Sequence, residues 1–422
     1  MTGWRVAADG RAFERDDTAA FLVADTVWSA FADAETGEWR RYVRHRSRQG
    51  FTHLLISILP ILHDRSVRAS AREPFAVDTD GRYDYSAPDE SYFENARDMV
   101  AVAREEGMQS ALVLLWCCYV PGTWGADRTP WAPMTPAERG AYIDLAVERF
   151  ADLDPMFIVS GDDAFTLDTA NEIYHDALRR VAAAAPDVLT TMHSTPSAEL
   201  PDAIADDPAL SYYAYQAGHH FDEQSRTWEL AQQYLDLSVR RPIVDLEPCY
   251  EGHGYGGGGG RWSRAEVRAA TWWSILGGAS AGIGYGAHGL WQWHRPGAHF
   301  TSPDFSLAPF PWEVALQFPA ADDVAFSAKI VTDAGLIGAA PAQHVLTDAY
   351  PGVRAALGRD GQLGVYVPYA GRVIINGRVE SATMWDLEAR RPIRPVLEID
   401  GAQTVLGQAD VPGDVLLVAR LT

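Results

Sequence analysis

Eight short apolar runs recur between residue 20 and about residue 325, and they restrict the fold more than any other feature of the chain. Each run is rich in aliphatic and aromatic residues and is apolar almost throughout, instead of alternating with polar residues. The runs occupy residues 21–25, 53–57, 111–116, 156–162, 188–193, 211–216, 242–247 and 282–288. Continuous runs of this length are typical of parallel strands covered on both faces. We therefore predict eight buried parallel strands.

Amphipathic segments separate these runs and predict helices. The clearest are residues 36–50, 89–107, 135–150 and 263–278. The third and fourth open with a capping box, in which Thr135 or Ser263 is followed three residues later by a glutamate. Eight strands that alternate with helices are the number that closes a (β/α)8 TIM barrel, an α/β fold. An open doubly wound sheet is disfavoured because no G-x-G-x-x-G motif follows the first run.

The pattern changes after about residue 330. The remaining residues contain short strand-like runs, such as QLGVYVPY, GRVIING and DVLLVARL, which are separated by Gly, Pro and Asp turns. This pattern of short strands and turns predicts a small antiparallel β-domain of the sandwich type. We therefore expect a catalytic barrel over residues 1–330 and a C-terminal β-domain over residues 331–422.

The charge balance restricts the partners and the compartment. The chain has 57 acidic and 35 basic residues and a formal net charge of −22, which disfavours binding to the phosphates of a nucleic acid. No apolar run reaches the roughly 20 residues that span a bilayer, and the N-terminus does not resemble a signal peptide. We therefore expect a cytoplasmic protein that binds neither nucleic acid nor membrane. The sequence leaves its oligomeric state open.

The cysteines and one glycine run do not predict a cofactor or metal site. Cys117, Cys118 and Cys249 are too few for a disulfide framework, and adjacent residues on a strand point to opposite faces. Buried thiols are therefore expected. The run Gly256–Gly260 lacks the Lys-Ser/Thr of a phosphate loop. A mobile loop beside the active site and a tolerated flexible insertion are both compatible with it.

Polar and aromatic residues follow the C-terminal ends of the predicted strands, which is where active sites of β/α barrels lie. The fourth and seventh strands end on Asp162 and Glu247. The other strand ends contribute Asp25, Trp28, Trp116, His193, Gln216, His219, Tyr285, His288 and Trp291. Such a mixture suits a sugar, because its hydroxyls bind carboxylates, amides and imidazoles while its C–H faces stack on aromatic rings.

Asp162 and Glu247 are the predicted catalytic pair. Cleavage of a glycosidic bond needs one carboxyl group that protonates the leaving oxygen and a second that attacks the sugar or activates water. Strands four and seven lie nearly opposite each other across a barrel mouth. That placement allows the separation of about 5–5.5 Å that a retaining mechanism uses. We expect Asp162 to be the acid/base and Glu247 the nucleophile, with the remaining strand-end residues binding the substrate.

Several of these residues have simpler structural explanations. Asp163 is a candidate N-cap for a helix near residues 168–185, and Asp25 a candidate structural acceptor. Trp272 and Trp273 lie in a predicted helix and are expected in the core. Glu251 is a candidate brace for the loop that holds Glu247.

Two other functions are weighed against a glycosidase. A metal-dependent barrel hydrolase would need clustered ligands, commonly a His-x-His after the first strand, where this chain has VADTVW. A non-catalytic carbohydrate-binding barrel would keep the aromatic residues and lose one of the two carboxyl groups, and both are present here. The pattern therefore favours a glycoside hydrolase.

The segments at the strand ends also resemble, in the same order, the motifs of a known family. VADTVWSAF (23–31), IVSGDD (158–163), YAYQAGHH (213–220), PIVDLEPCYEG (242–252) and GYGAHGLWQW (284–293) occur in the same order as similar segments in the apiosidase-like glycoside hydrolases, family 140 and its relatives. The terminal segment MWDLEARR (384–391) is similar to the C-terminal module of that family. The resemblance implies a cofactor-free glycosidase with its acid/base at Asp162 and its nucleophile at Glu247. It further implies release of a terminal sugar such as apiose, a branched pentose, or another pentofuranose or pyranose.

Overall fold

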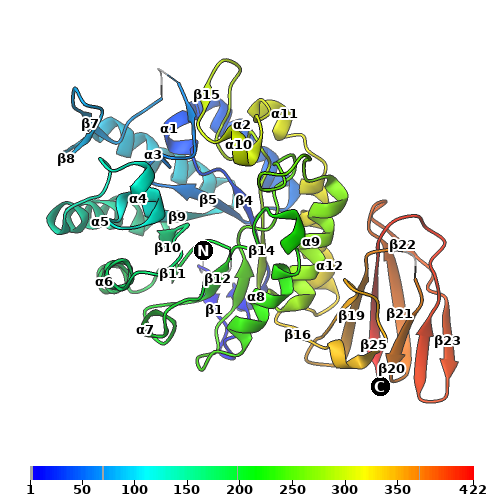
Figure 1. Ribbon diagram of the computed structural model, residues 1–422. Helices are drawn as coiled ribbons and strands as arrows, with labels where there is room; N and C mark the ends of the chain where they lie inside the picture. Colours follow the sequence, from blue (N-terminus) through cyan, green and yellow to red (C-terminus); the bar gives the residue numbers. More distant parts are fainter. Residues whose placement is uncertain (1–2, 69–70, 197, 370) are drawn as a thin grey trace.

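Eight parallel strands of the computed structural model lie side by side in one sheet that curves into a barrel (Figure 1). The structure describes residues 3–68, 71–196, 198–369 and 371–422. The barrel strands are β4 (Leu22–Thr26), β5 (His53–Ser57), β9 (Gln109–Trp116), β10 (Met156–Gly161), β11 (Leu189–Thr191), β12 (Tyr213–Tyr215), β13 (Ile243–Asp245) and β14 (Gly282–Tyr285). Each coincides with one of the eight apolar runs, so the predicted barrel is confirmed.

The strands follow one another around the barrel in chain order. The hydrogen-bonded order is β11-β10-β9-β5-β4-β14-β13-β12, in which β14 pairs with β4 to join the last strand to the first. Hydrogen bonds close the remaining seam between β11 and β12, from Ser211 N to Thr190 O at 3.0 Å and from Thr191 Oγ1 to Tyr212 O at 2.7 Å. Every carboxyl end of a strand therefore meets at one mouth.

Helices cover the outside of the barrel. They are α2 (Thr36–Gln49), α3 (Glu90–Glu105), α5 (Pro136–Phe150), α6 (Asp168–Ala184), α7 (Asp202–Ala205), α8 (Arg226–Leu235), α9 (Arg264–Gly277) and α12 (Ala320–Asp333). Both predicted capping boxes are present, because Thr135 and Ser263 accept hydrogen bonds from the backbone N–H groups of Glu138 and Glu266. Helix α2 ends at Gly50, whose φ of 103° lies in the left-handed region that glycine tolerates best.

Short strands that were not predicted from the sequence lie at the two ends of the barrel. At the bottom, the antiparallel strands β1 (Arg5–Val6), β2 (Phe13–Arg15) and β3 (Thr18–Ala20) place Phe13 against Tyr212. At the mouth, β6 (Ser66–Val67) pairs with β15 (His299–Phe300) and so connects the loop after β5 with the loop after β14. A hairpin of β7 (Phe75–Val77) and β8 (Tyr83–Pro88) extends from the same side (Figure 1).

Four single-turn helices lie in the longer loops. They are α1 (Ala30–Asp33), α4 (Trp124–Arg128), α10 (Pro303–Ser306) and α11 (Trp312–Ala315). Cys117 and Cys118 begin a 3₁₀ turn directly after β9 instead of lying on the strand, so the expectation of opposite strand faces was wrong. All three cysteines are buried free thiols, as expected.

The C-terminal part is a sandwich of two antiparallel sheets (Figure 1). One sheet has the order β16-β18-β19-β25-β21-β22 and the other the order β17-β20-β24-β23. Their strands are β16 (Ala340–Pro341), β17 (Leu346–Thr347), β18 (Arg354–Leu357), β19 (Gln362–Val367), β20 (Val373–Asn376), β21 (Val379–Asp386), β22 (Arg391–Ile393), β23 (Leu397–Asp400), β24 (Gln403–Leu406) and β25 (Val415–Leu421). A separate apolar core, which includes Val365, Ile375 and Leu417, lies between the sheets.

Helices α9 and α12 lie between the barrel and the sandwich (Figure 1). The buried Arg268 of α9 donates to Asp323 of α12 at 2.9 Å and to Asp414 beside β25 at 2.6 Å. Helix α12 continues to Asp333, three residues beyond the predicted boundary at residue 330. The division of the chain into two domains at residue 330 stays a prediction.

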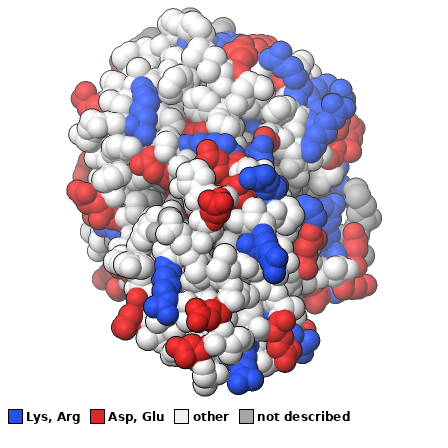
Figure 2. Space-filling model, turned by 90° about the vertical axis from the view of Figure 1, so that its right-hand side faces the viewer, with Lys and Arg blue, Asp and Glu red and all other residues white. Residues whose placement is uncertain are grey.

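On the face that carries the sandwich, the acidic side chains do not gather into one continuous acidic patch. Figure 2 shows acidic and basic side chains interspersed there, with uncharged areas between them. Among the described residues, no helix combines the length and the apolar character needed to cross a bilayer. The absence of nucleic-acid binding and the cytoplasmic location stay expectations from the sequence.

Candidate active site

One cavity at the mouth of the barrel collects most of the strand-end residues. Its volume is about 80 Å³, which is small for a small-molecule site. Its lining residues are Trp28, Ile61, His63, Asp64, Trp116, Asp162, Gln216, His219, Glu247, Tyr250, His253, Trp291 and Phe305. The predicted carboxyl pair thus shares one cavity with aromatic rings, imidazoles and an amide.

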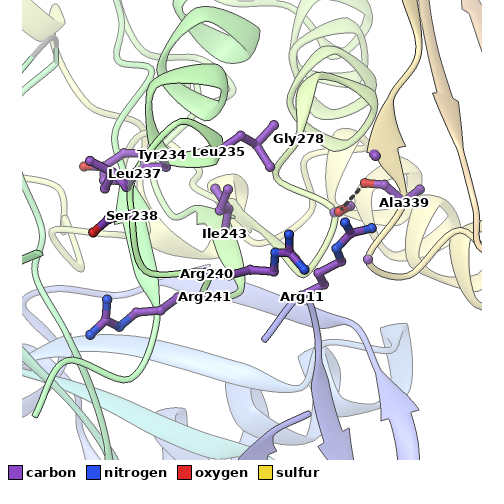
Figure 3. A pocket seen from close by; sticks show the side chains of 13 residues that line it. Arg11, Tyr234, Leu235, Leu237, Ser238, Arg240, Arg241, Ile243, Gly278 and Ala339 are labelled. Carbon is purple, nitrogen blue, oxygen red and sulfur yellow. Dashed lines mark hydrogen bonds between the residues drawn. The ribbon is translucent and has the colours of Figure 1, made fainter. Parts of the chain in front are cut away.

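A second hollow lies at the opposite end of the barrel, where β13 begins at Ile243 (Figure 3). Its charged side chains are Arg11, Arg240 and Arg241, and none of its described lining residues has a carboxyl group. The guanidinium of Arg241 donates hydrogen bonds to the backbone carbonyls of Ala205, Asp207 and Leu210. The hollow therefore offers no acid or base for hydrolysis, and it is at the end where β/α barrels do not carry active sites.

Glu247 is held by a histidine on each of its carboxylate oxygens. His193 Nε2 lies 3.1 Å from Oε2, and His219 Nε2 lies 3.0 Å from Oε1. Burial opposes ionisation of Glu247, but the hydrogen bonds from the two histidines outweigh it and lower its pKa to about 2. Glu247 is therefore ionised at neutral pH.

Backbone N–H groups fix the tautomers of both histidines. The N–H of Asp162 donates to His193 Nδ1 at 3.3 Å, and the N–H of Tyr250 donates to His219 Nδ1 at 3.4 Å. A nitrogen that accepts a hydrogen bond carries no proton, so each neutral ring carries its proton on Nε2. Both Nε2–H groups then donate to Glu247. This arrangement orients the carboxylate.

Asp162 has a strained backbone and a raised pKa. It follows β10 directly and has a φ of 54°, in the left-handed region that non-glycine residues rarely adopt. Its N–H is bound by His193, and its carbonyl accepts from Trp124 Nε1 at 2.8 Å. Burial, together with the negative charge of Glu247, raises the pKa of Asp162 to about 7. Strain of this kind is maintained where the surroundings fix a side chain for function.

Polar groups beneath the cavity support this geometry. Ser160 Oγ donates to His193 O and accepts from His193 N, at 2.9 and 3.0 Å. Asp245 Oδ1 accepts from the N–H groups of Glu247 and Ala217, at 3.3 and 3.4 Å, and Ser274 donates to its other oxygen at 2.7 Å. These contacts fix the backbones that carry His193 and Glu247.

Three tryptophans form the apolar wall. The rings of Trp28 and Trp116 meet edge to face at 5.2 Å, and Trp28 also contacts the ring of His193 at 5.6 Å. The Trp116 ring lies against the backbone of Gly161, where a Cβ atom would come within 2.4 Å of it. A glycine is therefore required immediately before Asp162. Among the described residues, the buried Nε1 atoms of Trp116 and Trp291 and Oε1 of Gln216 have no hydrogen-bond partner.

Comparison with known families identifies the family to which the chain belongs. The family model described as "Apiosidase-like, catalytic domain" matches residues 7–337, which is most of the chain. The chain belongs to the apiosidase-like family.

Solved structures agree with the fold of an apiosidase-like glycosidase. One described as a glycoside hydrolase is 18% identical with a TM-score of 0.82, over 100% of this chain and 97% of that chain. A glycoside hydrolase family 5 protein from Bacteroides vulgatus ATCC 8482 is 18% identical with a TM-score of 0.81, over 99% of this chain and 93% of that chain. No curated protein matches the sequence significantly. The expected apiosidase-like membership and barrel fold are thereby confirmed, and the protein is a glycosidase.

Seven of the predicted site residues line the cavity of this apiosidase-like protein, and four do not. His193 is fully buried behind the cavity and acts through its contact with Glu247. Tyr285 donates to Glu251 Oε2 at 2.9 Å. His288 Nε2 contacts Leu307 O at 2.9 Å. The fourth, Asp25, pairs with a helix outside the barrel. The residues at the cavity are Asp162, Glu247, Trp28, Trp116, Gln216, His219 and Trp291.

Two of the simpler structural explanations can be compared with the structure. Asp163 does not cap α6, because the cap position is Leu167 and the Asp163 carboxylate accepts from Phe165 N at 2.7 Å. Glu251 bridges Tyr285 and the N–H of Ala320 at the start of α12, which makes it a brace for the loop after β13. Burial raises the pKa of Glu251 to about 7.

The buried Asp25 gives a prediction about stability. Its Oδ2 accepts from Arg46 Nε and from Tyr42 OH, both at 2.6 Å, and both charged side chains are fully buried. Replacing Arg46 with methionine should lower the free energy of unfolding by about 3–5 kcal/mol, because the Asp25 charge would be left buried and unpaired. Chemical denaturation of both proteins measures this difference.

The control variant is Arg44→Met on the same helix. Arg44 pairs with Glu106 at 3.1 Å, and its side chain is 53% exposed. Loss of an exposed pair should change stability by about 1 kcal/mol or less. Equal effects of the two substitutions would contradict a structural role specific to Arg46.

In the described part of the chain, no three His, Cys, Asp or Glu side chains converge in a way that could hold a metal ion. Sequence reasoning missed six residues at the cavity. They are Ile61, His63, Asp64, Tyr250, His253 and Phe305. His63 and Tyr250 follow the second and seventh apolar runs within a few residues, but no pattern singled out Asp64, His253 or Phe305.

Proposed function

We propose that this glycosidase removes a terminal apiose-like pentose, or another pentofuranose or pyranose, with Asp162 as acid/base and Glu247 as nucleophile. The observation that carries the proposal is the opposite pKa shift of two carboxyl groups in one cavity. Glu247 is ionised far below neutral pH, whereas Asp162 keeps its proton up to about pH 7. Carboxyl groups whose environments separate their pKa values in this way are suited to act as nucleophile and acid.

The proposed mechanism has two steps. In the first, Glu247 attacks the anomeric carbon while Asp162 transfers its proton to the departing glycosidic oxygen. In the second, Asp162 removes a proton from water, which attacks the anomeric carbon and releases Glu247. Glu247 needs no deprotonation before its attack, and His193 and His219 hold it in place. Trp28, Trp116 and Trp291 provide surfaces on which a sugar ring can pack.

The shape of the cavity favours action on a chain end. One small cavity contains both carboxyl groups and is bounded by tryptophans and by residues of the β5 loop. A single terminal sugar fits this enclosure better than the interior of a polysaccharide. We therefore propose exo action, and the nucleophilic role proposed for Glu247 implies retention of the anomeric configuration.

A screen of aryl glycosides tests the proposal. Nitrophenyl furanosides and pyranosides, including apiosides, arabinosides and xylosides, should release chromophore with at least one sugar. Proton NMR of the first product should show the anomeric configuration of the substrate. Inverted product would exclude a nucleophilic role for Glu247, and no turnover of any glycoside would contradict the proposed substrate class.

The pH dependence follows from the two pKa values. Free enzyme is active when Asp162 is protonated and Glu247 is ionised, so kcat/KM should be highest below neutral pH and fall tenfold per unit above about pH 7. The acid limb should lie near pH 2 or be hidden by unfolding. Initial rates between about pH 4 and 9 measure the profile. A rate that rises through pH 7 would contradict the assignment of Asp162 as the acid.

A further inference from the structure

The loop after β5 contributes a third carboxyl group to the cavity. Asp64 lines the same cavity as Asp162 and Glu247, and its neighbour His63 lines it as well. Neither residue takes part in the two-step mechanism. Their presence so close to the reacting groups requires an explanation, because burial of an additional carboxyl group is unfavourable unless something compensates for it.

Contacts with a loop far away in the sequence hold this segment in place. The pairing of β6 with β15 joins residues 66–67 to residues 299–300. Arg65 N donates to Thr301 Oγ1 at 2.9 Å, and Ser302 Oγ donates to His63 O at 3.2 Å. The loop is therefore a fixed wall of the cavity, and the positions of the Asp64 and His63 side chains are determined by the fold.

Both side chains present polar atoms without a partner. Asp64 Oδ1 and His63 Nδ1 are buried and make no hydrogen bond with any residue that the structure describes. The His63 ring packs edge-on against Trp124 at 4.7 Å, and Trp124 in turn holds the carbonyl of Asp162. Burial lowers the pKa of His63 to about 4, so the ring is neutral at the pH of activity. A neutral imidazole and a carboxyl oxygen without partners are suited to bind hydroxyl groups.

Other buried polar atoms without a hydrogen-bond partner among the described residues line the same cavity. Gln216 Oε1, Trp116 Nε1 and Trp291 Nε1 are also buried without partners, and all three residues line the cavity. Buried polar atoms in proteins nearly always have a partner, and leaving several unpaired in one place is costly. Donors and acceptors that converge on one cavity, with rings among them, match a ligand that is rich in hydroxyls and has apolar C–H faces.

We propose that Asp64, together with His63, binds hydroxyl groups of the terminal sugar and determines which sugar the enzyme accepts. This inference rests on the proposed glycosidase function and adds the residues that recognise the glycone. Asp64 accepts from one sugar hydroxyl through Oδ1, and His63 bonds to another through Nδ1. A sugar without those hydroxyls leaves the two groups buried and unpaired, which is how a polar site rejects an analogue.

Asp64 also influences the acid. Burial, the bond to Ser302 and the charge of Glu247 set the pKa of Asp64 itself at about 7. Its negative charge is one of the groups that raise the pKa of Asp162, after burial and the charge of Glu247. An uncharged residue at position 64 should therefore shift the alkaline limb of the kcat/KM profile to lower pH. A residue that only supports the fold would not cause this shift.

The test compares Asp64→Asn with the wild-type enzyme on two aryl glycosides of the accepted sugar, one with a good and one with a poor leaving group. Replacing the buried carboxyl group that pairs with the sugar hydroxyl by an amide should lower kcat/KM by about 10-fold. Because recognition of the sugar does not depend on the aglycone, the loss should be the same for both substrates. The matched control is Asp304→Asn, which removes one exposed carboxyl group on α10 outside the cavity.

Sugar binding is measured separately in a background that cannot hydrolyse. Calorimetry with apiose, arabinose and xylose on Glu247→Gln and on Glu247→Gln/Asp64→Asn should show weaker binding to the double variant. His63→Asn is a second probe if Asp64→Asn is poorly folded by circular dichroism. Either substitution should weaken binding of the accepted sugar.

The outcomes separate the two proposals. Wild-type turnover that is unchanged in Asp64→Asn and His63→Asn would overturn the recognition proposal and leave the glycosidase proposal intact. A loss confined to the poor leaving group would overturn it too, because it would make Asp64 a proton donor. If the wild type cleaves no glycoside and Glu247→Gln binds no sugar, both proposals fail.

Discussion

Replacing Glu247 with glutamine should lower kcat by at least about 10⁴-fold, because the attacking carboxylate is removed. The surroundings make the amide a poor substitute in a second way. Both oxygens of Glu247 face an Nε2–H group, of His193 and of His219. A glutamine has one oxygen and one NH₂, so one histidine would face another donor. Steady-state kinetics on the best aryl glycoside measures the loss.

A control and a rescue experiment make this prediction specific. Glu229→Gln removes an exposed carboxyl group on α8, far from the cavity lining, and should leave kcat unchanged within about twofold. Glu247→Ala opens space for a small anion, and azide should then attack the anomeric carbon from the vacated side. The resulting glycosyl azide should have the configuration opposite to that of the substrate. Glycosyl azide with the substrate's configuration would contradict the nucleophile assignment.

The barrel strands and helix ends could be predicted from the sequence because they depend on local patterns. Each apolar run is a strand, since a parallel strand covered on both faces needs a continuous apolar segment. The capping boxes at Thr135 and Ser263 are present because a hydroxyl and a glutamate three residues apart bond the free N–H groups of the same helix turn. Such signals require no information about the rest of the fold.

The sequence indicated which strand ends carry polar residues but not the side to which they point. Asp25 and Tyr285 are register partners on β4 and β14. Both are near Arg46 of α2, which lies outside the barrel, as Asp25 bonds to it and its guanidinium lies 5.5 Å from the Tyr285 ring. In a run that is apolar on both faces, no alternation distinguishes the inside from the outside. The expectation that these two residues bind substrate was therefore wrong, because the sequence does not show on which side of the strand a side chain lies.

The β5 loop could not be predicted for a different reason. Asp64 and His63 lie in a long segment without helix or strand periodicity, and the pairing of β6 with β15 that fixes it spans more than 200 residues of sequence. A two-residue strand has almost no pattern of its own. The hairpin of β2 and β3 was missed similarly, because its turn at Asp16 and Asp17, with φ of 52° and 60°, lacks the usual glycine.

Replacing Asp162 with asparagine should lower kcat/KM by about 10²–10⁴-fold on glycosides with poor leaving groups, because these need a proton on the departing oxygen. On a nitrophenyl glycoside the first step should be almost unaffected. Water attack should still be slow, since the base is gone. Stopped-flow measurements should therefore show a burst of nitrophenol followed by slow turnover. Asparagine is the appropriate substitute because it tolerates the left-handed backbone at this position.

Asp163→Asn is the matched control for this experiment. Asp163 adjoins Asp162 in the chain but does not line the cavity, and an asparagine can still accept from Phe165 N through its side-chain oxygen. Its turnover should stay within about tenfold of the wild-type value, with no burst and no dependence on the leaving group. The same loss on good and poor leaving groups in Asp162→Asn would mean that this residue binds the sugar instead of protonating the aglycone. In that case Asp64, the other carboxyl group in the cavity whose pKa is raised to about 7, would take over as the candidate acid.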